Sequence, residues 1–145
     1  MNPTSHHALI ASAVGALRPH ETPGFGGSGA RGRRMGHVAA CLVTDTGNLH
    51  SGVCIDIGSG IGFCAEHAAV AAMVTAGEYR IAKIVAVWRN DETGAVHVQP
   101  SCGRCRELLV QIDPCNLDTE VVLGRNDSAT LRELLPVHDW PEPID

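Results

Sequence analysis

The chain has 145 residues, enough to bury a core without disulfide staples, and we expect a single domain over residues 1–145. With 44% apolar and 19% charged residues, its composition excludes an intrinsically disordered protein. A net charge of -5 and only 3% aromatic residues argue against a protein that binds nucleic acid.

The first apolar run, Ala8 to Leu17, predicts a helix that Thr4 or Ser5 can cap and Pro19 ends. It is not typical of a signal peptide, because no Lys or Arg precedes it. It is also far shorter than the roughly 20 residues that cross a bilayer. We therefore expect a cytoplasmic protein with no membrane segment.

Glycine and proline dominate the next stretch, and we expect a long loop from Arg18 to Met35. The glycines at 24–29 do not predict a phosphate loop, since no strand precedes them and no helix clearly follows. The arginines at 31, 33 and 34 fit a solvated loop edge, and they also fit a surface facing substrate or another subunit.

The rest of the chain alternates between predicted strands and helices, which indicates an α/β layered fold. The helix that starts at Cys64 is apolar almost all round, so we expect it in the interior. The run Ile81–Trp88 is continuously apolar, as in a strand covered on both faces. Strands are predicted at His37–Thr44, Asn48–Ile55, Ile81–Trp88 and Glu120–Leu123, and helices at Cys64–Ala76, Cys102–Ile112 and Ala129–Leu135.

Three cysteines and a glutamate form the motif that carries chemistry. Cys102 and Cys105 make a CxxC at a helix start, and alone this could be a redox pair or half of a zinc ribbon. The chain has no second CxxC, but Cys64 stands at another helix start. Three thiolates would leave one tetrahedral position open, as in catalytic zinc sites. Glu66 lies about 200° around the helix from Cys64, so it need not be a ligand and can act in proton transfer.

The tripeptide Cys64-Ala65-Glu66, followed by the CxxC at 102–105, resembles the zinc cytidine deaminases. With cysteine as the first residue of the tripeptide, the motif resembles the nucleoside branch of this family, which includes cytidine deaminase and blasticidin S deaminase. The resemblance runs from about His37 to Trp140. It implies a three-layer α/β/α fold with a mixed five-stranded sheet, a Zn²⁺ cofactor, and a homotetramer, or a dimer, with sites at subunit boundaries.

The same resemblance implies a hydrolytic deaminase that acts on C–N bonds of cyclic amidines and takes a small-molecule substrate. It implies zinc on the three cysteines and Glu66 as the group that moves protons from water to the ring nitrogen and the departing ammonia. The residues it places at the substrate are Ala65 through its N–H, a carbonyl near Pro100 or Ser101, Asp56, Cys54, and Trp140, which could instead pack at a subunit edge.

Four positions depart from this resemblance, and three of them shape the pocket. Gly36 stands where the family has Phe, Cys54 replaces the Asn of an Asn-x-Glu, and Ser101 separates Pro100 from Cys102. The fourth departure, His67, occupies the place of an Arg that balances thiolate charge; His67, Arg104 or Arg106 can supply that balance.

These departures leave several functions open. The first is deamination of a cytosine-type nucleoside or of a relative with an altered sugar. The others are a blasticidin S-type resistance deaminase, a deaminase of another amino-heterocycle, and a non-catalytic module stabilised by zinc.

Overall fold

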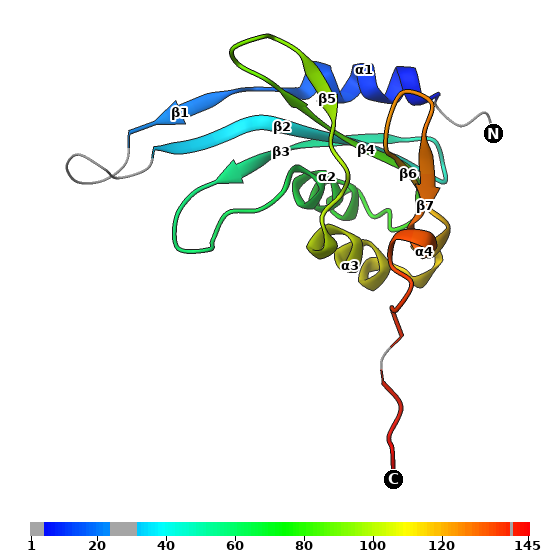
Figure 1. Cartoon of the computed structure of the whole chain (residues 1–145). Helices are drawn as coiled ribbons and strands as arrows, with labels where there is room; N and C mark the ends of the chain where they lie inside the picture. Colours follow the sequence, from blue (N-terminus) through cyan, green and yellow to red (C-terminus); the bar gives the residue numbers. More distant parts are fainter. Residues whose placement is uncertain (1–4, 24–31, 140) are drawn as a thin grey trace.

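The structure, a computed structural model, describes residues 5–23, 32–139 and 141–145. It is a mixed α/β fold in three layers, with one helix above a single sheet and the remaining helices below it (Figure 1). The predicted fold class is therefore confirmed. None of the helices in these ranges is long and apolar enough to cross a membrane.

The helices begin close to where the sequence predicted. Ser5 caps α1, accepting a hydrogen bond from the Ala8 N–H at 3.2 Å. Cys64 and Cys102 are the N-cap residues of α2 and α3. The helices are α1 (His6–Ala16), α2 (Ala65–Thr75), α3 (Gly103–Ile112) and α4 (Leu131–Leu134), with a 3₁₀ helix at Pro114–Asp118.

The described residues form a sheet of seven strands, but two pairs of strands lie end to end, so the sheet is only five strands across. Both β1 and β4 pair with β2 on the edge that faces away from β3, and both β5 and β6 pair with β4 on its far edge. Two of the five expected positions are thus each shared by two strands. The strands are β1 (His20–Thr22), β2 (Arg33–Thr44), β3 (Leu49–Asp56), β4 (Ile81–Arg89), β5 (Val96–Val98), β6 (Glu120–Val122) and β7 (Ser128–Thr130). Among the strands of the described residues, only the β4–β6 pair is parallel, so the sheet is mixed as expected.

Both faces of the central strands are covered. Alternate β2 residues point to opposite sides, so that Cys41 packs with Leu9 of α1 while Leu42 packs with Met73 of α2 and Leu109 of α3. Helix α2 lies directly on β3, because a Cβ at Gly52 would come within 2.4 Å of the Ala69 nitrogen. This close contact holds the middle of α2 against the sheet.

Three expectations need correction. The stretch 18–35 is not one long loop, because β1 and the first residues of β2 lie within it; residues 24–31 are outside the described ranges. The expected helix at 129–135 is shorter, since Thr130 caps α4 through a capping box with Glu133 and the residues before it pair as β7. Helix α2 is not buried all round, because Ala71 and Ala72 are exposed in the single chain.

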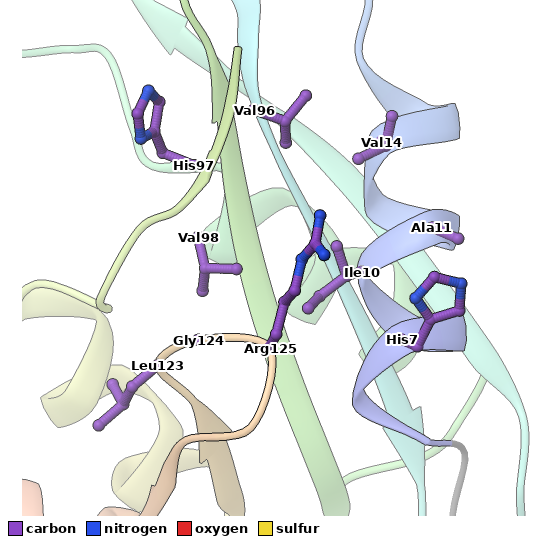
Figure 2. Close-up of a pocket in the computed structure, with 10 residues that line it drawn as sticks. All are labelled: His7, Ile10, Ala11, Val14, Val96, His97, Val98, Leu123, Gly124 and Arg125. Atoms are coloured by element: carbon purple, nitrogen blue, oxygen red, sulfur yellow. The ribbon is translucent and has the colours of Figure 1, made fainter.

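A groove of about 560 Å³ lies on the α1 side of the sheet, between α1, β5 and the turn after β6 (Figure 2). The side chain of Arg125 extends from this turn toward Ile10 of α1, with Val98 beside it. Among the described residues, no cysteine or carboxylate lines the groove. The groove therefore lacks the groups expected of a zinc deaminase site.

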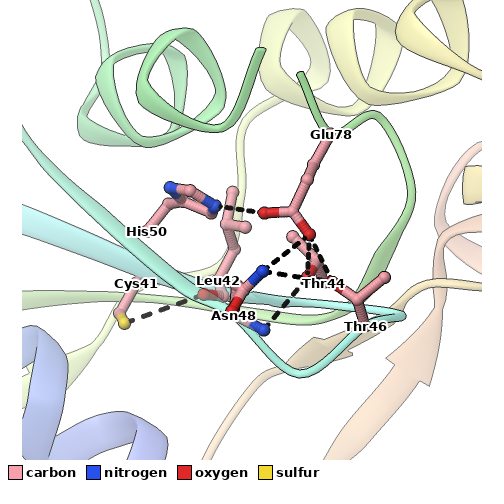
Figure 3. Close-up of polar contacts among 7 residues, drawn as sticks. All are labelled: Cys41, Leu42, Thr44, Thr46, Asn48, His50 and Glu78. Carbon is pink, nitrogen blue, oxygen red and sulfur yellow. Dashed lines mark hydrogen bonds and ion pairs between the residues drawn. The ribbon is translucent and has the colours of Figure 1, made fainter. Parts of the chain in front are cut away.

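The carboxylate of Glu78, just after α2, holds the β2–β3 hairpin to that helix (Figure 3). It accepts hydrogen bonds from Thr44 Oγ1 at 2.8 Å, from Thr46 Oγ1, and from Asn48 Nδ2 at 3.1 Å, and its other oxygen lies 2.8 Å from His50 Nε2. Because Cys64 is the N-cap of α2, this anchor at the far end helps to fix the helix that carries the motif.

Candidate active site

The structure brings the three motif cysteines together at the starts of α2 and α3. The Sγ atoms of Cys64 and Cys102 are 3.7 Å apart, those of Cys102 and Cys105 are 3.4 Å apart, and all three lie within 4.8 Å of one another. Two sulfurs at ~2.3 Å from a tetrahedral zinc ion would be separated by ~3.8 Å. The cluster therefore has the spacing that a zinc ion requires.

The three thiols lie in different electrostatic surroundings. Burial raises the pKa of Cys64 and of Cys105. Burial acts in the same direction on Cys102, but hydrogen bonds from the backbone N–H groups of Cys105 and Arg104 and from the neighbouring thiols outweigh it and lower its pKa. Those N–H groups belong to the first turn of α3, where the partial positive charge of a helix favours an anion. A bound cation would add to this effect and favour the thiolate form of all three residues.

Glu66 is the second residue of α2 and is only 5% exposed. Burial raises the pKa of its carboxyl group, opposed by hydrogen bonds from its own backbone N–H and from the Cys105 thiol. The carboxyl group is thus beside the cluster, yet Glu66 is not in the group whose ligand atoms all lie within 4.8 Å. A buried carboxyl next to a metal-binding group, but not within it, is suited to carry a proton.

Three basic residues were candidates to balance the thiolate charge. The Nε2 atom of His67 is buried with no hydrogen-bond partner among the residues described, and burial, followed by the charge of Arg104, lowers its pKa. Arg106 has other hydrogen-bond partners, since it donates to Leu134 O at 3.1 Å and to Ser101 Oγ at 3.5 Å. Arg104 is exposed and shares a pocket with Cys64.

That pocket has a volume of about 340 Å³ and opens beside the thiol cluster. Its polar and charged lining side chains, besides Cys64, are His37, Asp56 and Arg104, and the apolar ones include Ile55 and Phe63. This cavity is smaller than the groove on the α1 side, but it reaches a candidate metal ligand. We therefore take it as the candidate substrate pocket.

The five expected substrate residues fall in different places. Asp56 lines the pocket and is exposed. Cys54, 6% exposed, lies behind it, with Sγ 3.5 Å from His37 Nδ1. Ala65 and Ser101 are buried, at 0% and 5% exposed, and do not line the described pocket. Trp140 lies outside the described residues.

Sequence reasoning missed His37 as a pocket residue. The sequence predicts it only as the first residue of the strand His37–Thr44. The one local signal is Gly36 directly before this predicted strand, because a glycine at a strand can mark a bulge.

Fold and site together define an α/β/α protein with a three-cysteine candidate metal site at two helix starts. No family model matches the chain. The blasticidin-S deaminase of Bacillus cereus is 31% identical over 105 residues, which are 70% of this chain and 75% of that protein. The chain belongs to the cytidine deaminase superfamily.

Solved structures agree with this assignment. The cytidine deaminase of Burkholderia pseudomallei is 27% identical to this chain and superposes with a TM-score of 0.68. The superposition includes 93% of this chain and 99% of that protein. The cytidine deaminase of Bacillus anthracis is only 17% identical but shares the fold, with a TM-score of 0.70. That superposition includes 92% of this chain and 88% of that protein.

Proposed function

We propose that this protein is a zinc-dependent hydrolytic deaminase that releases ammonia from a cytosine-type nucleoside or a close analogue. The observation that carries the proposal is the buried Glu66 carboxyl beside three thiols whose spacing suits zinc. A purely structural zinc site has no need of such a carboxyl. Membership of the superfamily supports the same reaction class.

Cys64, Cys102 and Cys105 would hold the zinc ion, which when bound supplies a Lewis acid that makes hydroxide available at neutral pH. Glu66 would move two protons in turn, the first from water to the ring nitrogen and the second from the added hydroxyl group to the departing amine. The net reaction consumes water, breaks the bond between the ring carbon and the amine, and leaves a carbonyl and ammonia.

Other groups of the chain would bind and orient the heterocycle. The Ala65 N–H is one of the first four of α2, which have no acceptor within the helix, so it can donate to the ring's polar edge. A carbonyl near Pro100 or Ser101 can accept from the leaving amine. Asp56 at the open side of the pocket can accept from hydroxyl groups.

The decisive variant is Glu66→Ala. We expect it to fold, to keep its zinc, and to release no ammonia, because proton transfer is lost while the thiols remain. Glu92→Ala, which removes an exposed carboxylate from a turn, is the matched control and should keep full activity. Loss of zinc from Glu66→Ala, or unchanged turnover, would contradict the role assigned to Glu66.

A screen for ammonia release identifies the substrate. It should include cytidine, deoxycytidine, 5-substituted cytidines, blasticidin S, aminopurines and pterins. Similarity to a blasticidin-S deaminase makes that compound the second candidate, and its selective turnover would assign a resistance deaminase. Zinc-loaded protein that is inactive on every compound would favour a non-catalytic module.

The proposal includes a cytoplasmic homotetramer, or a dimer, as the working assembly. Its support in the structure is the exposed outer face of α2, where Ala71 and Ala72 meet solvent although the helix is apolar almost all round. Light scattering on the purified protein tests it, and a monomer at micromolar concentration would contradict it.

A further inference from the structure

At the wall of the candidate pocket, His37 of β2 contacts Cys54 of β3. The Cys54 sulfur lies 3.5 Å from Nδ1 and 3.9 Å from Nε2 of the His37 ring, so the thiol contacts the imidazole and Nδ1 is the nearer nitrogen. Cys54 is buried and does not line the pocket, whereas His37 is half-buried and does. The thiol therefore contacts the imidazole on the side away from the pocket.

A bulge in the sheet brings His37 to this place. Met35 pairs with Ile55 and Ala39 pairs with Val53, so the three β2 residues at 36–38 stand opposite the single residue at 54. Gly36 has a φ of 74° within this bulge, a conformation that glycine adopts without steric cost. Bulges beside active sites re-aim side chains, and this one places the imidazole over Cys54 at the pocket wall.

The position of His37 decides which part of a substrate it can reach. The amine-bearing carbon of a cytosine ring must approach the thiol cluster, where Cys64 lines the pocket. The ring nitrogen that carries the sugar is on the opposite side of the heterocycle, so the sugar extends away from the cluster. The polar side chains that line the pocket outside the thiol cluster are His37, Asp56 and Arg104. Arg104 lies in the first turn of α3 between two of the thiols, whereas His37 and Asp56 come from the strands, and these two are the groups that we assign to the sugar.

The chemistry of the pair suits hydroxyl groups. Burial, and then the charge of Arg34, lower the pKa of His37, while Asp56 and Asp91 oppose this shift more weakly. A neutral imidazole offers one donor and one acceptor, and a thiol can occupy only one of them. The remaining nitrogen and the acceptor-only carboxylate of Asp56 together can bind hydroxyls on neighbouring carbons.

Building on the proposed deaminase function, we propose that His37, held by Cys54, is the residue that selects substrates with free sugar hydroxyls. His37 is a specificity-determining residue, and Cys54 is its positioning residue.

The test compares cytidine with 2′,3′-dideoxycytidine, which lacks both neighbouring hydroxyls, as substrates of the zinc-loaded enzyme. One neutral hydrogen bond contributes about 0.5–1.5 kcal/mol, so His37→Ala should lower kcat/KM for cytidine by roughly two- to twelvefold, mainly through KM. The same variant should leave kcat/KM for the dideoxy compound unchanged. His37→Asn, which keeps a donor and an acceptor, should recover part of the loss.

His7→Ala is the matched control, because His7 is exposed on α1 across the sheet, and it should change neither substrate. Zinc content and the urea midpoint are measured on each variant. An equal loss on both substrates, or no loss on cytidine, overturns the role of His37 and leaves the deaminase assignment intact. No ammonia from any compound with the wild-type enzyme overturns the proposed function, and the role of His37 with it.

Discussion

Gly36 gives the sharpest stability prediction, because its backbone excludes every other residue. Its φ is 74°, and a Cβ there would lie 1.9 Å from the carbonyl oxygen of Arg18. The Arg18 N–H also donates to the Gly36 carbonyl at 2.9 Å, so the two backbones cannot separate freely. The left-handed conformation costs an L-residue about 1–2 kcal/mol. The backbone shift needed to avoid the clash costs about 1–3 kcal/mol more.

Gly36→Ala should therefore lower the free energy of unfolding by roughly 2–5 kcal/mol. With a urea m-value of about 1–3 kcal/mol/M, we expect the unfolding midpoint to fall by on the order of 1–2 M. Gly15→Ala is the matched control, since Gly15 lies in α1 and a methyl group added there would have no atom within 4 Å, and it should gain up to about 1 kcal/mol. Equal midpoints for Gly36→Ala and the wild type would refute the reasoning.

Three further predictions concern the core, the hairpin anchor and the metal. Leu109→Ala, at a fully buried position between α3 and the sheet, should lose about 2–5 kcal/mol by urea unfolding, and a loss below about 1 kcal/mol would contradict the packing described. Hydrogen bonds from Thr46, His50 and Thr44 lower the pKa of Glu78 from 4.5 to about 2, so its contribution to stability is complete above pH 4.5 and is lost as the pH falls toward 2. The stability advantage of the wild type over Glu78→Gln should accordingly shrink between pH 6 and pH 3, and a constant difference would disprove the anchor's ionic character. Cys105→Ser should weaken zinc binding by more than the roughly 10–100-fold loss seen for outer-shell partners, whereas Cys115→Ser, at an exposed thiol outside the cluster, should bind zinc normally in a metal-content assay.

The parts that the sequence predicted well depend on local signals. Runs of helix-forming residues lie within one short segment, so the starts of α2 and α3 followed from them, and Gly77 marked the end of α2. The grouping of the three cysteines was predicted from their placement at these two starts together with the family resemblance, and the structure brings their sulfurs together. The long buried strand β4 followed from its continuous apolar run. Pairing partners are far away in sequence, and the three-residue strands β1 and β5 show no periodic pattern of their own.

The pocket wall was harder to predict because it depends on register. Gly36 can signal an irregularity, but the strand pattern does not show that three residues of β2 oppose one residue of β3, because a bulge is a property of the pair of strands. The hydrogen-bond partners of Arg106 were equally hard to predict, because Ser101 and Leu134 come from segments that only the fold brings together.

The departures from the family at Gly36 and Cys54 look in the sequence like two separate losses, an aromatic ring and an amide. In the structure they belong to one unit, because the bulge that Gly36 permits puts His37 against Cys54. A Phe at 36 would meet the Arg18 carbonyl, so the bulge and the family's ring exclude each other. The polar group that Cys54 does not supply is offered instead by the neighbouring imidazole. The two changes are therefore better explained as an exchange of one pocket wall for another than as decay of a cytidine site, and this favours a working enzyme with its own substrate preference.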